Sequence, residues 1–236
     1  MKKIFAVFLL MNCLIFTGCF QGETGLNFDS SGKITFHNRI IGIPYAMNQI
    51  EEVKNNIVKN NPNAKVESVT QGNFSGYDIT IEYPNIEKFN EQNFNLYTAK
   101  QGKSMGIQKT NNWFYDSYTV DLFIEGKKST SNSTDEYSQL GESMAQTILS
   151  QAKFDLVITI PYSADSNNAD ITSNDGKTFT WNIVNSLVFG QDRQIKLNFK
   201  VWNIGCIIIT FLGLLVVIGI IVRYVKKSKK IEDTES

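Results

Sequence analysis

Residues 204–222 carry no charged side chain and consist mainly of isoleucine, leucine and valine. At about 1.5 Å of rise per residue, a helix over this segment is roughly as long as the 30 Å hydrocarbon core of a bilayer. Trp202 and Tyr224 bracket it as interfacial aromatic residues, and a cluster of cations follows. A buried core helix is the alternative, but it would not be apolar on every side and then end in cations. The sequence therefore predicts a transmembrane helix over residues 204–222, a cytoplasmic basic tail over 223–236 and the preceding domain outside the cell.

The first residues have the features of a bacterial export signal. Two lysines precede an apolar run over residues 4–16, and small residues lie just before Cys19, although Phe16 stands where a lipoprotein signal usually has leucine. An uncleaved N-terminal anchor is the alternative, but the run of roughly 13 residues is shorter than the ~20 that a spanning helix requires. We predict a lipoprotein signal peptide over residues 1–18 and a lipid-modified Cys19.

The predicted exported domain, residues 19–203, is attached at both ends. Lipid on Cys19 and the helix after Asn203 are expected to hold it close to the bilayer. Cys13 lies in the signal peptide and Cys206 in the helix, so the domain has no disulfide and must depend on an ordinary hydrophobic core. The chain has 23 basic and 23 acidic residues, and no basic patch in the domain indicates a nucleic-acid partner.

Helical periodicity predicts about two amphipathic helices. Residues 47–59 have apolar side chains at three- and four-residue steps, and an Asn-Pro-Asn sequence ends the pattern. A second helix is predicted after Thr134 or Asp135. Its apolar face is formed by Tyr137, Leu140, Met144 and Ile148. Residues 85–95 are predicted to form a shorter helix.

Alternation of apolar and polar side chains predicts the strands. These cover residues 34–36, 66–69, 77–83, 107–109, 113–125, 154–160, 178–183 and 194–202. The pair 107–109 and 113–125 is predicted to form a hairpin with its turn at 110–112. The fold class is therefore α+β, an antiparallel-rich β-sheet domain with about two amphipathic helices, followed by one C-terminal transmembrane helix.

A strand, a polar turn and a returning strand lie near the end of the domain. The first strand ends at Pro161, the turn contains Asn168 and Asp170, and Trp181 lies in the middle of the returning strand. Together with the lipobox Cys19 and the C-terminal helix, this pattern resembles the LppM-domain family of bacterial envelope lipoproteins. The resemblance implies an α+β envelope domain, with lipid or glycolipid binding proposed for a relative, and it brings no catalytic residue.

Each residue of this hairpin also has a structural explanation. Pro161 lacks an amide proton and cannot continue a strand ladder. Asn168 and Asp170 tolerate turn conformations and can bond to their own backbone. Trp181 is expected to bury a large apolar area while its indole N–H needs a partner. We therefore expect these four residues to stabilise the fold rather than to contact a ligand.

The sequence shows no constellation typical of catalysis or metal binding. His37 is the single histidine, which argues against a two-histidine metal site and against an ordinary serine–histidine pair. Residues 165–175 are rich in Asp and Asn, but Ala169 breaks the spacing of a calcium loop. We predict no catalytic residue, no metal and no cofactor.

An aromatic cluster follows the predicted hairpin turn. It consists of Trp113, Phe114, Tyr115 and Tyr118. Adjacent residues on a strand face opposite sides, so Trp113 and Phe114 would not enter the same core. One face of the cluster is a candidate for contact with a lipid ligand or the membrane, and packing between sheets is the alternative.

These features predict a non-enzymatic envelope lipoprotein whose external domain binds a lipid or another amphiphilic component at the cell membrane. A protein-interaction or sensory module, docking an envelope protein partner, is the alternative. An enzyme that uses acidic or hydroxyl residues is the third and weakest hypothesis.

Overall fold

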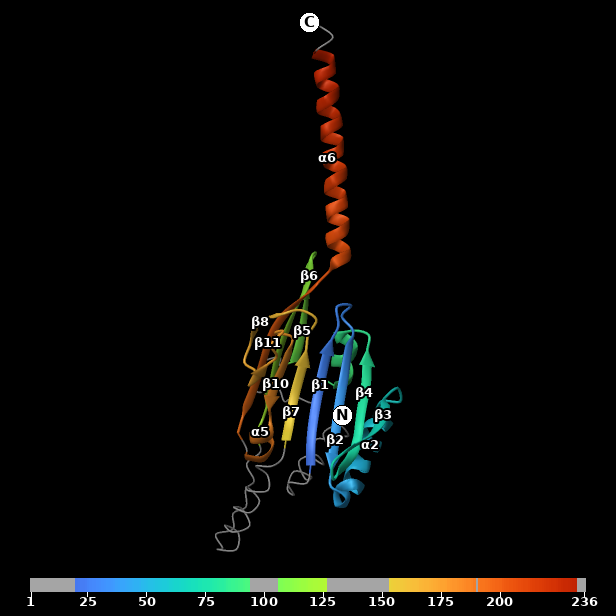
Figure 1. Ribbon diagram of the computed structural model, residues 1–236, viewed down its shortest axis with the longest axis vertical. Helices are drawn as coiled ribbons and strands as arrows, with labels where there is room; N and C mark the ends of the chain where they lie inside the picture. The colour runs from blue at the N-terminus through green and yellow to red at the C-terminus, as the bar shows by residue number, and fades with distance from the viewer. Residues whose placement is uncertain (1–19, 94–105, 127–152, 190, 233–236) are drawn as a thin grey trace.

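The computed structural model describes residues 20–93, 106–126, 153–189 and 191–232. They form two β-sheets with short helices beside them and one long helix that projects from one end (Figure 1). The fold class is α+β with mostly antiparallel strands, as predicted. The predicted signal peptide, Cys19 and the predicted helix after Thr134 or Asp135 lie outside the described residues.

The larger sheet has seven strands in the order β3-β4-β2-β1-β7-β10-β9. These are β1 (Phe20–Phe28), β2 (Ile34–Gly42), β3 (Lys65–Gln71), β4 (Phe74–Tyr83), β7 (Lys153–Thr159), β9 (Ile171–Thr172) and β10 (Thr178–Asn182). Its neighbouring strands are antiparallel apart from β1 and β7, which run parallel.

The smaller sheet has four strands in the order β5-β6-β11-β8. These are β5 (Gly106–Asn111), β6 (Tyr115–Ile124), β8 (Ala164–Asn167) and β11 (Arg193–Trp202). All three of its pairings are antiparallel. Strand β11 then leads into the long helix α6 (Ile204–Glu232).

The main hydrophobic core lies between the two sheets. Phe28 of the larger sheet packs edge-on against Tyr118 and Phe199 of the smaller one, with ring centroids 5.7 and 5.1 Å apart. Tyr118 and Phe199 stack on each other at 5.0 Å. Trp181 belongs to the same cluster and is 0% exposed. Alternation along the strands directs these side chains inward, because successive residues of a strand face opposite sides.

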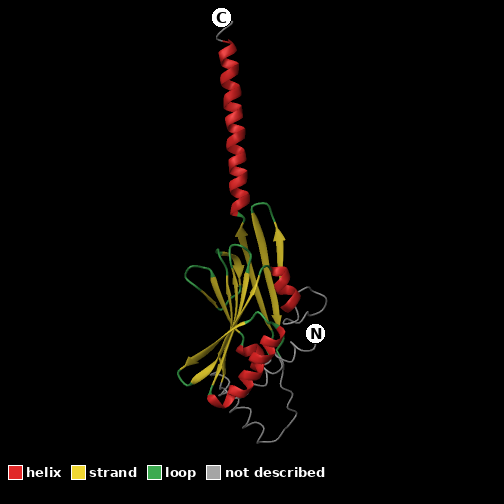
Figure 2. Cartoon of the chain, turned by 90° about the vertical axis from the view of Figure 1, so that its right-hand side faces the viewer, coloured by secondary structure: helices red, strands yellow, loops and turns green. Residues whose placement is uncertain are grey.

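The short helices pack against strands of the larger sheet, and α3 also contacts β5 of the smaller sheet. The predicted helix at residues 47–59 is confirmed as α2 (Met47–Asn60), which follows a single 3-10 turn, η2 (Pro44–Ala46). Its Ile50 and Val53 pack with Ile40 and Phe154 in a second cluster. Helix α3 (Ile86–Asn93) adds to the main core, and α5 (Val184–Phe189) joins β10 to β11. Figure 2 shows the short helices beside the strands and α6 leaving them at one end.

Three parts of the strand prediction were wrong or incomplete. Strand β1 was not predicted, because its sequence is polar and its strand conformation depends on pairing with both β2 and β7. Strands β8 and β9 lie in a segment predicted to be a turn. The β5–β6 turn lies at residues 112–114 rather than 110–112, so Trp113 and Phe114 are turn residues.

Candidate functional site

The junction between the domain and α6 is held by specific hydrogen bonds. Asn203 is the single residue between β11 and α6. Its main-chain N–H donates to the carbonyl of Phe114 at 2.8 Å, which extends the ladder between β11 and β6 by one step. Its side-chain Oδ1 accepts from the N–H of Cys206 at 3.2 Å, as an N-cap does. The helix therefore continues directly from the sheet without a flexible linker.

The β5–β6 turn lies against the first turns of α6. The indole Nε1 of Trp113 donates to the Thr210 hydroxyl at 3.0 Å. Tyr115 and Trp202 pack edge to face with ring centroids 5.6 Å apart. Three of the four residues of the predicted aromatic cluster thus lie beside the helix junction, which the sequence pattern did not indicate.

Tyr118 has a different environment from the other three aromatic residues. It is 1% exposed and stacks on Phe199 in the main core. Burial raises the pKa of its phenol. A side chain this buried does not contact a bilayer, so the membrane-contact prediction is wrong for Tyr118, and packing between the sheets accounts for it.

A cavity of about 420 Å³ lies at the same junction. Its walls come from the β1–β2 turn, from β6, from the loop after β7, and from the end of β11 with the start of α6. The lining residues are Ser30, Ser31, Gly32, Asp116, Tyr162, Val201, Trp202, Asn203, Ile204 and Gly205. The walls thus combine hydroxyl, amide and carboxylate groups with the apolar beginning of a helix. Sequence reasoning missed this site, because its residues come from four separated segments.

The carboxylate in the cavity wall is paired. Asp116 Oδ2 lies 2.9 Å from Lys109 Nζ on the neighbouring strand β5. Burial alone would lower the pKa of Lys109, but the bond to Asp116 and other nearby negative groups outweigh it and raise that pKa. Lys109 therefore stays charged and offsets the charge of Asp116 at neutral pH.

The β1–β2 turn in the cavity wall is organised by Asp29. Its Oδ1 accepts from the N–H of Ser31 at 2.8 Å, from the Ser31 hydroxyl at 2.7 Å and from the N–H of Lys33 at 3.0 Å. Gly32 has a φ of 85°, a conformation that glycine adopts without strain. Slight burial raises the pKa of Asp29, but these hydrogen bonds and the charge of Lys33 outweigh it, so the net pKa is lowered.

Replacing Asp29 by asparagine should therefore have a pH-dependent cost. Because its folded-state pKa is below the unfolded value of about 3.9, the carboxylate stabilises the turn above that pH, and the effect disappears as pH falls through the folded pKa. We expect Asp29→Asn to lower the free energy of unfolding at pH 7 by at most about 1 kcal/mol, since the group is largely exposed. Urea unfolding of the full chain in detergent at pH 7 and at low pH measures this. Glu67→Gln, an exposed change on β3, is the control, and a difference that persists at low pH would contradict the role of the charge.

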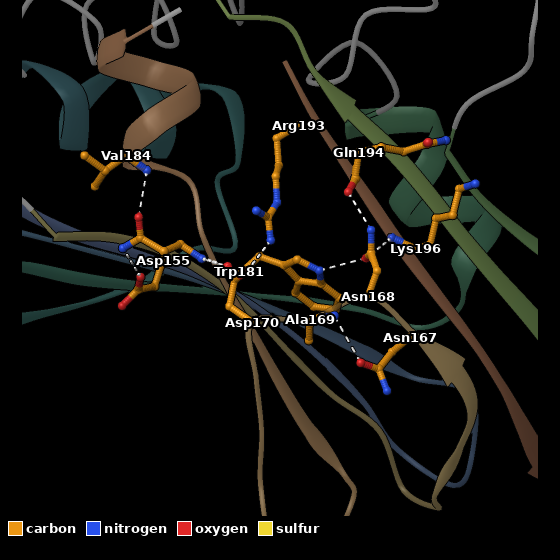
Figure 3. A network of polar contacts seen from close by, with 11 residues as sticks. Asp155, Asn167, Asn168, Ala169, Asp170, Trp181, Val184, Arg193, Gln194 and Lys196 are labelled. Carbon is orange, nitrogen blue, oxygen red and sulfur yellow. Dashed lines mark hydrogen bonds and ion pairs between the residues drawn. The ribbon is translucent and has the colours of Figure 1, made fainter. Parts of the chain in front are cut away.

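The hairpin residues named from the sequence form a polar bridge between the two sheets (Figure 3). Asn168 Oδ1 accepts from Trp181 Nε1 at 3.0 Å and from the N–H of Lys196 at 2.8 Å, while its Nδ2 donates to the carbonyl of Gln194 at 2.8 Å. One amide side chain thus contacts β10 of the larger sheet and β11 of the smaller sheet.

Asp170 makes a second connection of the same kind. Its Oδ2 accepts from the N–H of Asn182 at 2.8 Å, and its Oδ1 pairs with Arg193 Nη2 at 2.6 Å. Pro161 lies just after β7, whose ladder ends at Thr159. The contacts of Asn168 and Asp170 reach other strands, whereas the sequence suggested bonds within their own turn. All of the contacts described for them hold the fold together.

The remaining predicted site residues are placed as follows. Cys19 lies outside the described residues. His37 lies on β2 with Nε2 2.6 Å from Asp78 Oδ1. Among the described residues, no group of three His, Cys, Asp or Glu side chains is arranged to hold a metal ion. Helix α6 has one stretch, Ile204–Arg223, that is long and apolar enough to cross a membrane, and that stretch is not buried against the domain. This is compatible with membrane association.

No family model matches this chain, and no curated protein matches it. In fold, the chain is similar to LppM. The solution NMR structure of the folded domain of Mycobacterium tuberculosis LppM matches 79% of this chain and 92% of that domain, with a TM-score of 0.41 and 7% sequence identity. This is the family that the terminal hairpin of the sequence resembles. A likeness at this level concerns the course of the chain and transfers no residue, ligand or activity.

Proposed function

We propose that this protein is a non-enzymatic, membrane-anchored envelope lipoprotein that holds the polar headgroup of an amphiphilic molecule in the cavity at the α6 junction. The position of that cavity carries the proposal. Ile204 and Gly205, the first residues of α6, form part of its wall. When α6 spans a bilayer, the cavity lies at the depth of the lipid headgroups, and a lipid in the outer leaflet can reach it while its acyl chains stay in the membrane.

The lining favours an uncharged headgroup rich in hydroxyl groups, such as the sugar of a glycolipid. Ser30, Ser31 and Tyr162 supply hydroxyl groups, and Asn203 supplies an amide. Such groups both donate and accept hydrogen bonds. The described lining contains no lysine or arginine, and the carboxylate of Asp116 faces Lys109, so there is no dedicated site for a phosphate.

Narrowing the cavity should remove this binding. Gly205 lies in the cavity wall, and a Cβ at this position would meet only Asn203 Oδ1, at an ordinary 3.6 Å, so Gly205→Leu should leave the fold intact. Gly213→Leu is the matched control, because Gly213 lies on the same helix with nothing within 4 Å of an added Cβ. We expect Gly205→Leu to reduce glycolipid retention by roughly tenfold, equivalent to about 1.4 kcal/mol.

Native mass spectrometry of the full chain, released from nanodiscs that contain phosphatidylcholine, phosphatidylglycerol and a glucosyl diacylglycerol, measures the retention. The proposal predicts that the wild-type chain and Gly213→Leu retain the glycolipid preferentially, whereas Gly205→Leu does not. Wild-type protein that carries no lipid, or that retains all three lipids equally, would contradict it.

The proposed attachment to the membrane has two parts, the lipid on Cys19 and the helix α6. They are connected to opposite ends of the domain. The end of β1 at Phe28 pairs with Ile34 and adjoins the turn that lines the cavity. The start of β1 at Phe20 lies at the other end of this nine-residue strand, about 26 Å away at roughly 3.3 Å per residue (Figure 1). With the domain upright on α6, lipid on Cys19 would lie far from the bilayer. Both attachments reach one leaflet only when the domain lies along the membrane.

Protein docking is a second candidate function, and one surface favours it. The face of the larger sheet that carries His37, Glu23 and Asp78 is polar, and its side chains are partly exposed. His37 lies between the two carboxylates, with Asp78 as the nearer partner. Crosslinking in cells followed by purification separates the candidates, because a stoichiometric protein partner without bound lipid would favour docking.

A further inference from the structure

The tip of the β5–β6 hairpin exposes two large aromatic side chains. Trp113 is 66% exposed and Phe114 is 43% exposed. Two main-chain polar groups of the tip have partners within the protein: the N–H of Asn112 donates to the carbonyl of Tyr115, and the carbonyl of Phe114 accepts from the N–H of Asn203. This tip therefore presents apolar surface while two of its backbone groups are satisfied without water.

The one polar atom of the Trp113 side chain is also satisfied within the protein. Its indole N–H donates to Thr210, and the Thr210 hydroxyl donates in turn to the carbonyl of Cys206 at 2.7 Å. Thr210 is the single hydroxyl residue in the segment 204–222. An indole whose N–H is already bonded can enter an apolar medium without the cost of an unsatisfied donor.

The bond to Thr210 also fixes the depth of the indole. Thr210 lies six residues after Ile204, which is about 9 Å along the helix axis at roughly 1.5 Å per residue. The apolar stretch Ile204–Arg223 has 20 residues, enough for the hydrocarbon core. A membrane boundary near Ile204 therefore places Trp113 below the headgroups of the outer leaflet. Tryptophan is one of the two residue types enriched at membrane–water interfaces.

We propose that the β5–β6 hairpin is an additional membrane anchor, which inserts Trp113 and Phe114 into the outer leaflet beside α6. This inference rests on the proposed membrane span of α6 but not on a ligand in the cavity. The exposed side chains of Trp113 and Phe114 contact the lipids of the bilayer rather than a protein partner. In a Cys19→Ala chain, which carries no lipid at its N-terminal end, α6 and the hairpin anchor the domain at one end only. The domain then stands upright and keeps η2, which follows β2 at the end of the larger sheet where β1 begins, away from the membrane.

Quenching of tryptophan fluorescence by brominated lipids tests this insertion. The chain has three tryptophans, and Trp202→Phe leaves Trp113 with the fully buried Trp181. The full chain with Cys19→Ala, in which no lipid at the N-terminal end draws the domain onto the membrane, is reconstituted in phosphatidylcholine vesicles whose acyl chains are brominated near the headgroup. We expect this variant to lose roughly half of its emission, since one of its two tryptophans lies within reach of the bromine atoms.

Two further variants in the same background serve as controls. Adding Trp113→Phe leaves Trp181 alone, and the quenching should disappear. Adding both Trp113→Phe and Tyr45→Trp places a tryptophan in η2, at a position where the native tyrosine is 86% exposed. This tryptophan, the reporter at position 45, should not be quenched. Thr210→Val removes the acceptor for the indole, so the emission of Trp113 should shift to the red as the ring moves toward the headgroups.

The outcomes separate this inference from the proposed membrane span. Protein that floats with the vesicles while Trp113 is not quenched overturns the hairpin anchor and leaves α6 as the anchor. Quenching of the reporter at position 45 as strongly as Trp113 overturns the upright arrangement. Protein that does not float with the vesicles overturns the span of α6, and the hairpin anchor with it.

Discussion

Replacing Trp181 by alanine should lower the free energy of unfolding by about 3–5 kcal/mol, the usual cost of removing a buried Trp side chain. Trp181 is 0% exposed, belongs to the cluster between the sheets and donates its indole N–H to Asn168. Small domains are stable by roughly 5–15 kcal/mol, so this change removes a large part of the total. Urea unfolding of the full chain in detergent, followed by near-ultraviolet circular dichroism, measures the loss.

Two variants show whether the loss of stability in Trp181→Ala comes from the burial of this side chain or merely from the removal of a tryptophan. Trp113→Ala removes the same side chain from an exposed turn and should change the free energy of unfolding by about 0.5 kcal/mol or less. Asn168→Ala keeps Trp181 but leaves its buried N–H without the described acceptor, which should cost about 1–3 kcal/mol. Equal effects of Trp181→Ala and Trp113→Ala would contradict the place of Trp181 in the core.

Protease added to intact cells should digest the domain completely and spare an epitope tag placed after Ser236. The apolar stretch Ile204–Arg223 is long enough to span the bilayer, and the cations that follow it favour the cytoplasmic side. Cys19→Ala should abolish labelling by radioactive fatty acid while the protein stays in the membrane fraction, because α6 alone is a sufficient anchor. Immunoblots of both fractions measure the outcome.

A chain that carries Cys19→Ala and ends after Asn203 is the control for this experiment. It lacks both the lipid and α6, keeps only the hairpin tip, and should be released from the membrane. Digestion of the C-terminal tag from outside, or release of the full-length Cys19→Ala protein, would contradict the proposed topology. Because neither chain carries lipid on Cys19, this pair tests the helix as an anchor by itself.

The position of β1 restricts how the domain can be oriented when it is attached to the membrane both by lipid on Cys19 and by α6. Lipid on Cys19 and the start of α6 were expected to hold the domain close to one bilayer, but Phe20 begins β1 at the end of the sheet away from α6. If fatty-acid labelling shows that Cys19 is lipidated, the reporter at position 45 decides between an upright and a lying domain. Lipid on Cys19 in the same leaflet as α6 should bring that reporter within reach of the quencher.

Local patterns in the sequence were sufficient for the elements that depend on near neighbours. The apolar segment 204–222 predicted α6, because spanning length and composition are properties of one continuous segment. The helix itself continues as far as Glu232, beyond the predicted span. The three- and four-residue steps between Met47 and Lys59 predicted α2, and the strict alternation from Tyr77 to Tyr83 predicted β4.

Elements that depend on distant partners were decided by the tertiary structure. Strand β1 has a polar sequence and exists because it is paired on both sides, in parallel with β7 from far along the chain. The predicted turn of the β5–β6 hairpin was displaced by two residues, since the register with β6 keeps Thr110 and Asn111 in the ladder. Periodicity describes one strand and does not specify its neighbours.

The candidate site likewise has features that the sequence predicted and features that only the tertiary structure decided. The sequence by itself identified the aromatic cluster that contains Trp113 and Phe114 and, separately, the apolar segment 204–222, without any connection between them. Only the tertiary structure brings Trp113 to Thr210 across 97 positions of the chain and assembles the cavity from four segments. The physical reason is that composition and periodicity act over one or two turns of chain, whereas a cavity and a long-range contact require the packing of whole sheets.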